Sequence, residues 1–317
     1  MNQEILLTVT TLQDFITQSL ISDTSQIRSL TIAIDNNKLP QTTSIQTESE
    51  NRNATEGTRQ LWSQLERFAN LLPAVSNLAT FSLNVISKSK NGFWIPRPLI
   101  ARLIIALPRT CIAIQIDTQG QDLGEPKSAH LCHAIRTILP QLQHMRLRVG
   151  TICKNLFRTE AEIIEAPYLE TLLINCLGKG VQGHQARLCN SFQEDPYYSQ
   201  LFLGQEAASD LALSIQALVP HCPRRTHIAL IDSGNCDDED QSVYATLNRR
   251  NIMRNTIYSM PFVTIAPFQS DGVLLRTQDK DIIADLPELQ AFAEEGLWKA
   301  TSPEGFMLPA NLIEDWG

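Results

Sequence analysis

The sequence predicts an α/β solenoid, in which a parallel sheet is lined on one side by outer helices. The main observation is a phrase that recurs along the chain: an apolar, helix-like run ends in proline, and a short strand-like L-x-L follows it. Clear copies lie at 71–83, 106–116 and 138–149, and weaker copies lie at 166–174 and 218–231. A helix–strand unit that repeats along a chain is typical of solenoids, which mostly bind other macromolecules.

The interval between the predicted strands supports the repeat. At the second apolar residue of each L-x-L, the intervals are 51, 33, 31, 27 and 56 residues, measured from Ile32 through Leu83, Ile116, Leu147 and Ile174 to Leu230. The first interval contains a polar segment at 36–58, which we interpret as an insertion, and the last is close to two repeats of 28. A unit of 27 to 33 residues lies at or above the long end of the leucine-rich-repeat range.

Hydrophobic periodicity assigns the individual elements. Alternation of apolar and polar residues predicts strands, which we place at 30–34, 81–85, 112–116, 145–149, 172–174 and 227–232. Apolar stripes at helical spacing predict helices, which we place at 12–21, 58–72, 98–106, 128–139, 205–219 and 241–252. In the tail we expect two strands, within 261–268 and 271–277, and a helix at 287–298.

The change of character near residue 260 predicts two parts. We assign 1–260 to a leucine-rich-repeat-like solenoid that carries the polar insertion at 36–58, and 261–317 to an irregular C-terminal cap. The last twenty residues are rich in loop-forming residues, and we expect them to lie over the end of the solenoid.

Composition excludes several classes of partner. The net charge is −8, and the longest basic clusters are pairs of arginines, so we expect no nucleic-acid partner. The N-terminal MNQEILLTVTTLQDF lacks the pattern of a signal peptide. The longest apolar stretch, 99–107, is interrupted by Arg102 and is shorter than the ~20 residues of a membrane span, so we expect no membrane partner. These features predict a cytoplasmic or nuclear protein.

No motif predicts a catalytic, cofactor-binding or metal-binding site. The seven cysteines form no C-x-x-C pair and are odd in number, which favours free, buried thiols. His130, Cys132 and His133 are close in sequence, but no second ligand pair has zinc-site spacing. The segment Gly178–Gly180 lacks the rest of a phosphate-binding loop. We therefore predict no enzyme activity, no cofactor and no metal.

The best candidates for partner contacts are the strand residues that alternate with the core-facing residues. In a leucine-rich solenoid the sheet lines the concave face, and its non-core positions face a partner. Such positions on one strand hold a basic set, and neighbouring strands contribute two further polar residues. The predicted partner-binding residues are His144, Arg146, Arg148, Gln115 and Glu170.

Several segments resemble a known family. LLPAVSNLATFSL at 71–83, ILPQLQHMRLRVGTIC at 138–153 and APYLETLLI at 166–174 resemble the leucine-rich repeats of F-box-type proteins. More narrowly, residues 130–157 and the tail at 271–312 resemble fungal F-box-like proteins. The resemblance spans about 5–315 and implies the substrate-recognition region of a ubiquitin-ligase F-box protein, with a protein substrate as partner.

One part of that family's pattern is missing. In such proteins an N-terminal F-box module docks on the adaptor Skp1, and it starts with an L-P-x-E-I-L-like sequence. Here EILLTV at 4–9 lacks the preceding Leu-Pro and continues into a strand pattern. The chain therefore resembles the substrate-recognition part alone, and we do not predict Skp1 as a partner.

Two other interpretations fit the same alternation of helices and strands. An α/β enzyme would hold its site at the carboxyl ends of the strands, where Asp117, Asn175 and Asp232 would be the candidates. A diverged or truncated family member that only folds is the other alternative.

Overall fold

The structure is a computed structural model. It describes residues 3–19, 23–35, 39, 56–86, 94–123, 131–152, 156–157, 164–176, 187–188, 205–235, 244–264, 273–276, 281–284, 298–300 and 307–309. The polar insertion predicted at 36–58 lies largely outside these residues. So does the helix predicted at 287–298, of which only Trp298 is described, in a strand.

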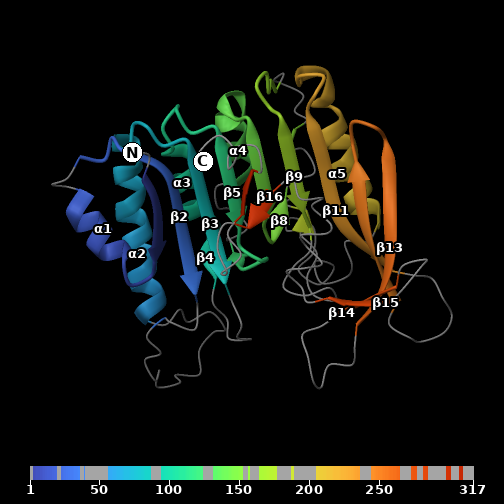
Figure 1. The fold of residues 1–317 in the computed structure, drawn as a ribbon, viewed down its shortest axis with the longest axis horizontal. Helices are drawn as coiled ribbons and strands as arrows, with labels where there is room; N and C mark the ends of the chain where they lie inside the picture. Colours follow the sequence, from blue (N-terminus) through green and yellow to red (C-terminus); the bar gives the residue numbers. More distant parts are fainter. Residues whose placement is uncertain are drawn as a thin grey trace.

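The described residues form an α/β fold around one 11-stranded sheet. Seven parallel strands come first and stand in chain order, each hydrogen-bonded to the next. They are β1 (Gln3–Thr8), β2 (Ile27–Asp35), β3 (Thr80–Ile86), β5 (Ala113–Asp117), β7 (His144–Arg148), β9 (Thr171–Asn175) and β11 (His227–Asn235). Every strand predicted from the recurring phrase is confirmed, and all of them lie in this single sheet (Figure 1).

The sheet continues with four antiparallel strands. These are β12 (Tyr244–Asn251), β13 (Thr256–Thr264), β14 (Val273–Arg276) and β15 (Asp281–Ala284). The prediction of a helix at 241–252 was wrong, because residues 244–251 of this segment form strand β12, which pairs with β11. A tight turn at Ile252–Asn255, in which Asn255 has φ 51°, returns the chain into β13. Asparagine tolerates this left-handed conformation better than most residues do.

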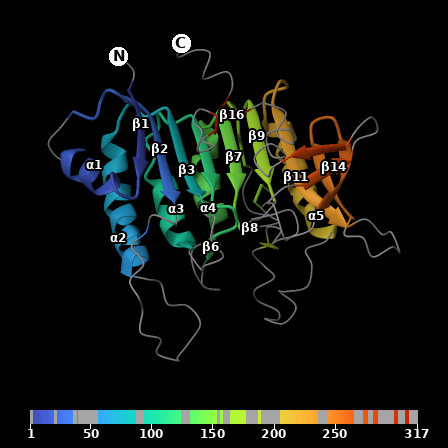
Figure 2. The same ribbon diagram turned by 60° about the horizontal axis from the view of Figure 1, so that its bottom comes forward.

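The helices line one side of the sheet. They are α1 (Leu12–Ser19), α2 (Glu56–Leu71), α3 (Arg97–Ile105), α4 (Leu131–Ile138) and α5 (Gln205–Gln216). Helix α1 packs against α2, α2 against α3, and α3 against α4, so the helices follow one another in chain order like the strands (Figures 1 and 2). Within the described residues, no helix combines the length and the apolar character that a membrane crossing needs.

The recurring proline has a defined structural role. Three helical runs end in a 3₁₀ turn that carries proline at its start: Leu72–Ala74, Leu139–Gln141 and Val219–His221. Each turn closes with the same backbone hydrogen bond, for example from the Leu142 N–H to the Leu139 carbonyl at 3.1 Å. Because proline disfavours continuation of an α-helix, the chain tightens and turns towards the next strand. The repeated phrase is therefore a repeated helix-to-strand turn.

The core lies between the sheet and the helices. Alternate residues of each parallel strand, such as Leu83, Ile116 and Leu147, are fully buried and pack in one apolar cluster with the inward stripes of the helices. The predicted free thiols are confirmed for Cys111, Cys132, Cys176 and Cys222, of which Cys222 is only half-buried. The remaining three cysteines lie outside the described residues.

Three short strand pairs lie outside the large sheet: β4 (Ile95–Pro96) with β6 (Asp122–Leu123), β8 (Thr151–Ile152) with β10 (Arg187–Leu188), and β16 (Trp298–Ala300) with β17 (Met307–Pro309). Most of the segment 261–317, which we assigned to an irregular cap, lies outside the described residues, and its described residues lie in strands. β17 contacts β5, near the middle of the parallel sheet. The predicted division between 260 and 261 falls inside β13.

Candidate functional site

The candidate site is the polar face of β5 and β7, which lies opposite the helices. In the parallel register Gln115 stands beside Arg146, and Asp117 stands beside Arg148. His144 begins the same row on β7, next to Thr171 of β9. Paired residues of neighbouring strands share a face, so the structure brings His144, Arg146, Arg148 and Gln115 together, as the alternation predicts.

Four of the five predicted partner-binding residues are buried, whereas a face open to a partner would expose them. Exposed fractions are 0% for His144, 2% for Arg146, 1% for Arg148 and 1% for Gln115. Only Glu170, which directly precedes β9, has an exposed side chain, at 54%. The four strand residues are therefore interior polar groups, and they contact other atoms of the protein.

The position of β17 explains part of this burial. β17 contacts β5, and β5 is already hydrogen-bonded on both edges, to β3 and to β7. β17 therefore lies over a face of the sheet and not at its edge. The other face of β5 packs its isoleucines into the helical core, so β17 lies on the polar face.

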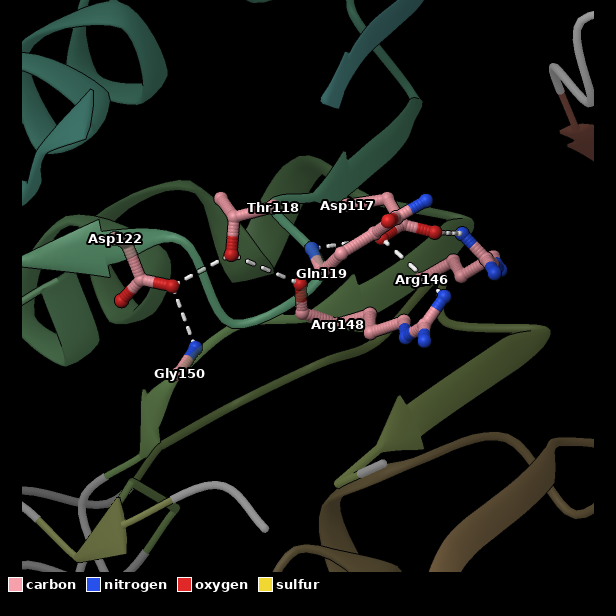
Figure 3. A network of polar contacts seen from close by, with 7 residues as sticks. All are labelled: Asp117, Thr118, Gln119, Asp122, Arg146, Arg148 and Gly150. Atoms are coloured by element: carbon pink, nitrogen blue, oxygen red, sulfur yellow. Dashed lines mark hydrogen bonds and ion pairs between the residues drawn. The ribbon is translucent and has the colours of Figure 1, made fainter. Parts of the chain in front are cut away.

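Asp117 is the centre of a buried charge cluster at the carboxyl end of β5 (Figure 3). The Arg146 guanidinium donates a hydrogen bond to Asp117 Oδ2 at 2.9 Å, and Arg148 Nη1 lies 3.9 Å from Oδ1. The Gln119 backbone N–H also donates to Oδ1, at 3.1 Å. Buried charges are stable when they are paired and hydrogen-bonded, as this carboxylate is.

A second buried carboxylate, Asp122, fixes the loop that follows β5. Its Oδ1 accepts from the Thr118 hydroxyl and from the Gly150 N–H, each at 2.5 Å (Figure 3). Its Oδ2 accepts from Arg97 Nε at 3.1 Å. The loop turns through Gln119, which has φ 51°, and Gly120, which has φ 77°.

Backbone contacts join this loop to the end of β7. The Thr118 N–H donates to the Arg148 carbonyl at 2.8 Å. Gly150 approaches so closely that an added Cβ would lie 2.9 Å from the Gly120 carbonyl oxygen. Sequence reasoning missed this cluster. The available signal was a Thr-Gln-Gly turn directly after β5 and a glycine two residues after the end of β7.

His144 is buried in its neutral form. Its Nδ1 lies 3.0 Å from the Thr171 hydroxyl, and its Nε2 lies 3.9 Å from a Glu170 carboxylate oxygen. Burial lowers the pKa of the imidazole to about 4, because desolvation disfavours the charged ring. At neutral pH this position therefore contributes a polar group and no positive charge.

The residues considered for an enzyme site are not brought together. Asp117 and Asn175 lie on the polar face, but Asp232 directly follows Ile231, the partner of Asn175, and so points to the opposite face. There it accepts from Arg250 Nε at 2.6 Å and from Asn248 Nδ2 at 2.8 Å.

The group near Asp232 also includes a thiol. Burial raises the pKa of Cys176 to about 12, and the Asp232 carboxylate contributes to this rise. A thiol with this pKa is protonated at neutral pH and is a weak nucleophile. Among the described residues, no group of three or more His, Cys, Asp or Glu side chains is arranged to hold a metal ion.

Comparisons of this chain with protein-family models, with curated proteins and with solved structures find no match. The resemblance to F-box-type leucine-rich repeats therefore stays a prediction from the sequence.

Proposed function

We propose that this chain is a protein–protein interaction module, built as a leucine-rich-repeat-like solenoid and without catalysis of its own. The observation that carries the proposal is the strand order: seven parallel strands follow one another in chain order. In open α/β enzymes the strand order reverses at a switch point, where a ligand crevice opens. The described parallel strands contain no such reversal.

The handedness of the connections supports the same conclusion. Crossovers between parallel strands are almost always right-handed, so a sheet that grows in one direction places all its crossover helices on one side. In such solenoids the opposite face is the one that contacts a macromolecule, although four of the five predicted residues on it are buried in this structure. Here that face carries the predicted partner-binding residues His144, Arg146, Arg148 and Gln115, with Glu170 at its rim.

The sequence resemblance makes the proposal more specific. It suggests the substrate-recognition region of a ubiquitin-ligase F-box protein, so the partner would be a protein destined for ubiquitination. We do not propose Skp1 as a partner of this chain, because no F-box sequence is found in it. Recovery of Skp1 in a binding experiment would show that the chain joins a ligase by other residues.

Affinity capture followed by mass spectrometry tests the proposal. The comparison uses the wild type, Glu170→Lys at the rim of the polar face, and Glu66→Lys on the exposed side of α2 as a matched charge reversal. We expect at least one protein to be retained by the wild type and by Glu66→Lys, and to be lost with Glu170→Lys. Calorimetry with the purified partner then checks direct binding.

The opposite pattern would contradict the proposal. If binding depends on Glu66 and not on Glu170, the helical side is the contact surface. If no protein distinguishes the variants, the polar face is not a docking surface. Circular dichroism of both variants checks that the substitutions leave the fold intact.

A further inference from the structure

The hairpin of β12 and β13 leaves part of a sheet edge open. β13 spans Thr256–Thr264, but β14 pairs only with residues 262–264 of it, and Figure 1 shows β14 and β15 near one end of β13. Among the described residues, no strand pairs with the outer edge of residues 256–260. Pro261, which has no N–H to donate, ends this stretch. Such an edge offers its backbone N–H and C=O groups to an added strand.

Side chains on both faces of this edge are exposed. Ile257 is 58% exposed and Tyr258 is 49% exposed, and successive residues of a strand point to opposite faces of the sheet. The Arg249 guanidinium lies over the Tyr258 ring, 5.2 Å from its centroid, which favours one position of the ring. Large apolar side chains left open around an unpaired edge indicate a contact site for another chain.

The charge of the hairpin selects the kind of chain that fits it. Residues 244–264 contain three arginines and no acidic side chain, whereas the whole chain has a net charge of −8. Arg250 is paired with Asp232, at 2.6 Å. Arg254 lies in the hairpin turn with its side chain exposed, and no described group forms an ion pair with it. The hairpin therefore carries positive charge that is open to a partner.

Two further arginines lie at the same end of the sheet as Arg254. The Ile252 N–H donates to the Ile228 carbonyl at 3.0 Å, so the hairpin turn lies beside the start of β11. Arg224 and Arg225 come just before that start, and both are exposed. The open edge of β13 thus begins next to three exposed guanidinium groups. Such planar groups bind carboxylates through paired hydrogen bonds.

We propose that the outer edge of residues 256–260, with Arg224, Arg225 and Arg254 at its end, binds an extended acidic segment of a protein partner. The segment adds a strand beside β13 and places its carboxylates next to the hairpin turn. This surface is separate from the polar face of β5 and β7, so the inference goes beyond the proposed function and does not depend on it.

A second copy of this chain fits the edge less well than an acidic segment does. Full antiparallel pairing of two β13 edges would bring the hairpin turn of each copy against β14 of the other, because β14 occupies residues 262–264. Parallel pairing would bring the two sets of arginines together, and like charges repel. A short segment of a different chain avoids both conflicts.

Synthetic peptides test the edge on the full-length protein. Each peptide contains alternating threonine and valine, which favour a strand, and a run of glutamates at one of its two ends. Reference peptides carry lysines in place of the glutamates, or N-methyl groups that remove backbone donors. Fluorescence anisotropy at about 0.05 M salt, where charges are weakly screened, measures the affinity. Hydrogen exchange followed by mass spectrometry locates the protected amides.

We expect one of the two acidic peptides to bind about tenfold more tightly than its lysine and N-methylated counterparts, and to protect the amides of residues 256–260. Arg254→Glu should weaken this binding about tenfold, and Arg224→Glu with Arg225→Glu should do the same. Arg109→Glu, at an exposed position before β5 at the same end of the sheet, should leave it unchanged. Circular dichroism and thermal unfolding check that the variants fold.

Four results would overturn the inference. Acidic peptides that bind no more tightly than the lysine peptides would exclude an acidic partner. An N-methylated peptide that binds as well as its parent would exclude an added strand. Protection of other amides in place of 256–260 would move the contact elsewhere. A dimer of the free protein in gel filtration, with residues 256–260 already protected, would show that a second copy occupies the edge.

Discussion

Arg146 on β7 donates a hydrogen bond to the carboxylate of Asp117 on β5 at 2.9 Å, with both side chains almost completely buried. The two residues are diagonal neighbours, offset by two residues, because Asp117 stands directly beside Arg148 and Gln115 beside Arg146. The carboxylate therefore lies between two guanidinium groups of the neighbouring strand.

Replacing Asp117 by asparagine should strongly destabilise the fold. The change removes the negative charge that both buried guanidiniums face, and loss of one member of a buried ion pair typically costs about 3–5 kcal/mol. Urea unfolding measures the free energy. Asp14→Asn, an exposed site on α1, should change it by less than about 0.5 kcal/mol. A loss below about 1 kcal/mol for Asp117→Asn would show that the cluster relaxes without its carboxylate.

Replacing Gly150 by alanine should destabilise the junction of β5 and β7. The added Cβ would lie 2.9 Å from the Gly120 carbonyl oxygen and 3.1 Å from Asp122 Oδ1. Overpacking of this kind typically costs about 1–3 kcal/mol, and the neighbouring backbone oxygen has little room to move. Thermal unfolding checks the prediction. A melting temperature equal to that of the wild type would mean that the loop shifts without loss of its hydrogen bonds.

Acid should destabilise the protein through His144. Burial lowers the pKa of this imidazole to about 4, against an ordinary value of 6.5, so the unfolded chain binds the proton more tightly than the folded one. Stability is therefore complete above pH 6.5 and is lost as the pH falls from about 6.5 to about 4, by an amount on the order of 3 kcal/mol. The nearby Glu170 carboxylate opposes this effect, and burial outweighs it.

Urea titrations at pH 7, 5.5 and 4.5 separate His144 from other titrating groups. His144→Asn keeps a polar side chain that can bond to the Thr171 hydroxyl but cannot titrate. Its stability should depend less on pH than that of the wild type between pH 6.5 and 4.5. Identical pH dependence for the two proteins would place the acid sensitivity elsewhere.

The sequence predicted the strands and their faces well because one side of each strand packs against helices. Ile114 and Ile116 must alternate with Gln115 for that side to stay apolar, and the same holds for Met145 and Leu147 on β7. Alternation identifies the face that belongs to the core. It contains no information on what covers the other face, because polar residues can face water or other polar groups.

The sequence around Arg146 therefore did not predict that this side chain is buried. Its ion-pair partner Asp117 lies on the neighbouring strand β5, and β5 is contacted by β17, which follows β7 by more than half the chain. Local periodicity does not report such distant contacts. The failure at β12 has a related cause. The sequence of β12 is compatible with a helix. The segment forms a strand because it can pair along the edge of β11 through a complete ladder of hydrogen bonds.

The Asp122 cluster gives the sharpest test of the junction between β5 and β7. Asp122 binds Arg97, Thr118 and Gly150 at once, so Asp122→Asn removes the charge and aims an N–H group at other donors. We expect a loss of about 3–5 kcal/mol, as for other buried ion pairs. Thr118→Val, which removes a single hydroxyl donor, should cost about 1 kcal/mol.

A double-mutant cycle with Arg97→Met in urea unfolding should give a coupling energy of about 0.5–3 kcal/mol between residues 97 and 122. Simple additivity of the two changes would mean that Asp122 stabilises the loop through Thr118 and Gly150 alone, and that α3 is held to the sheet by apolar packing.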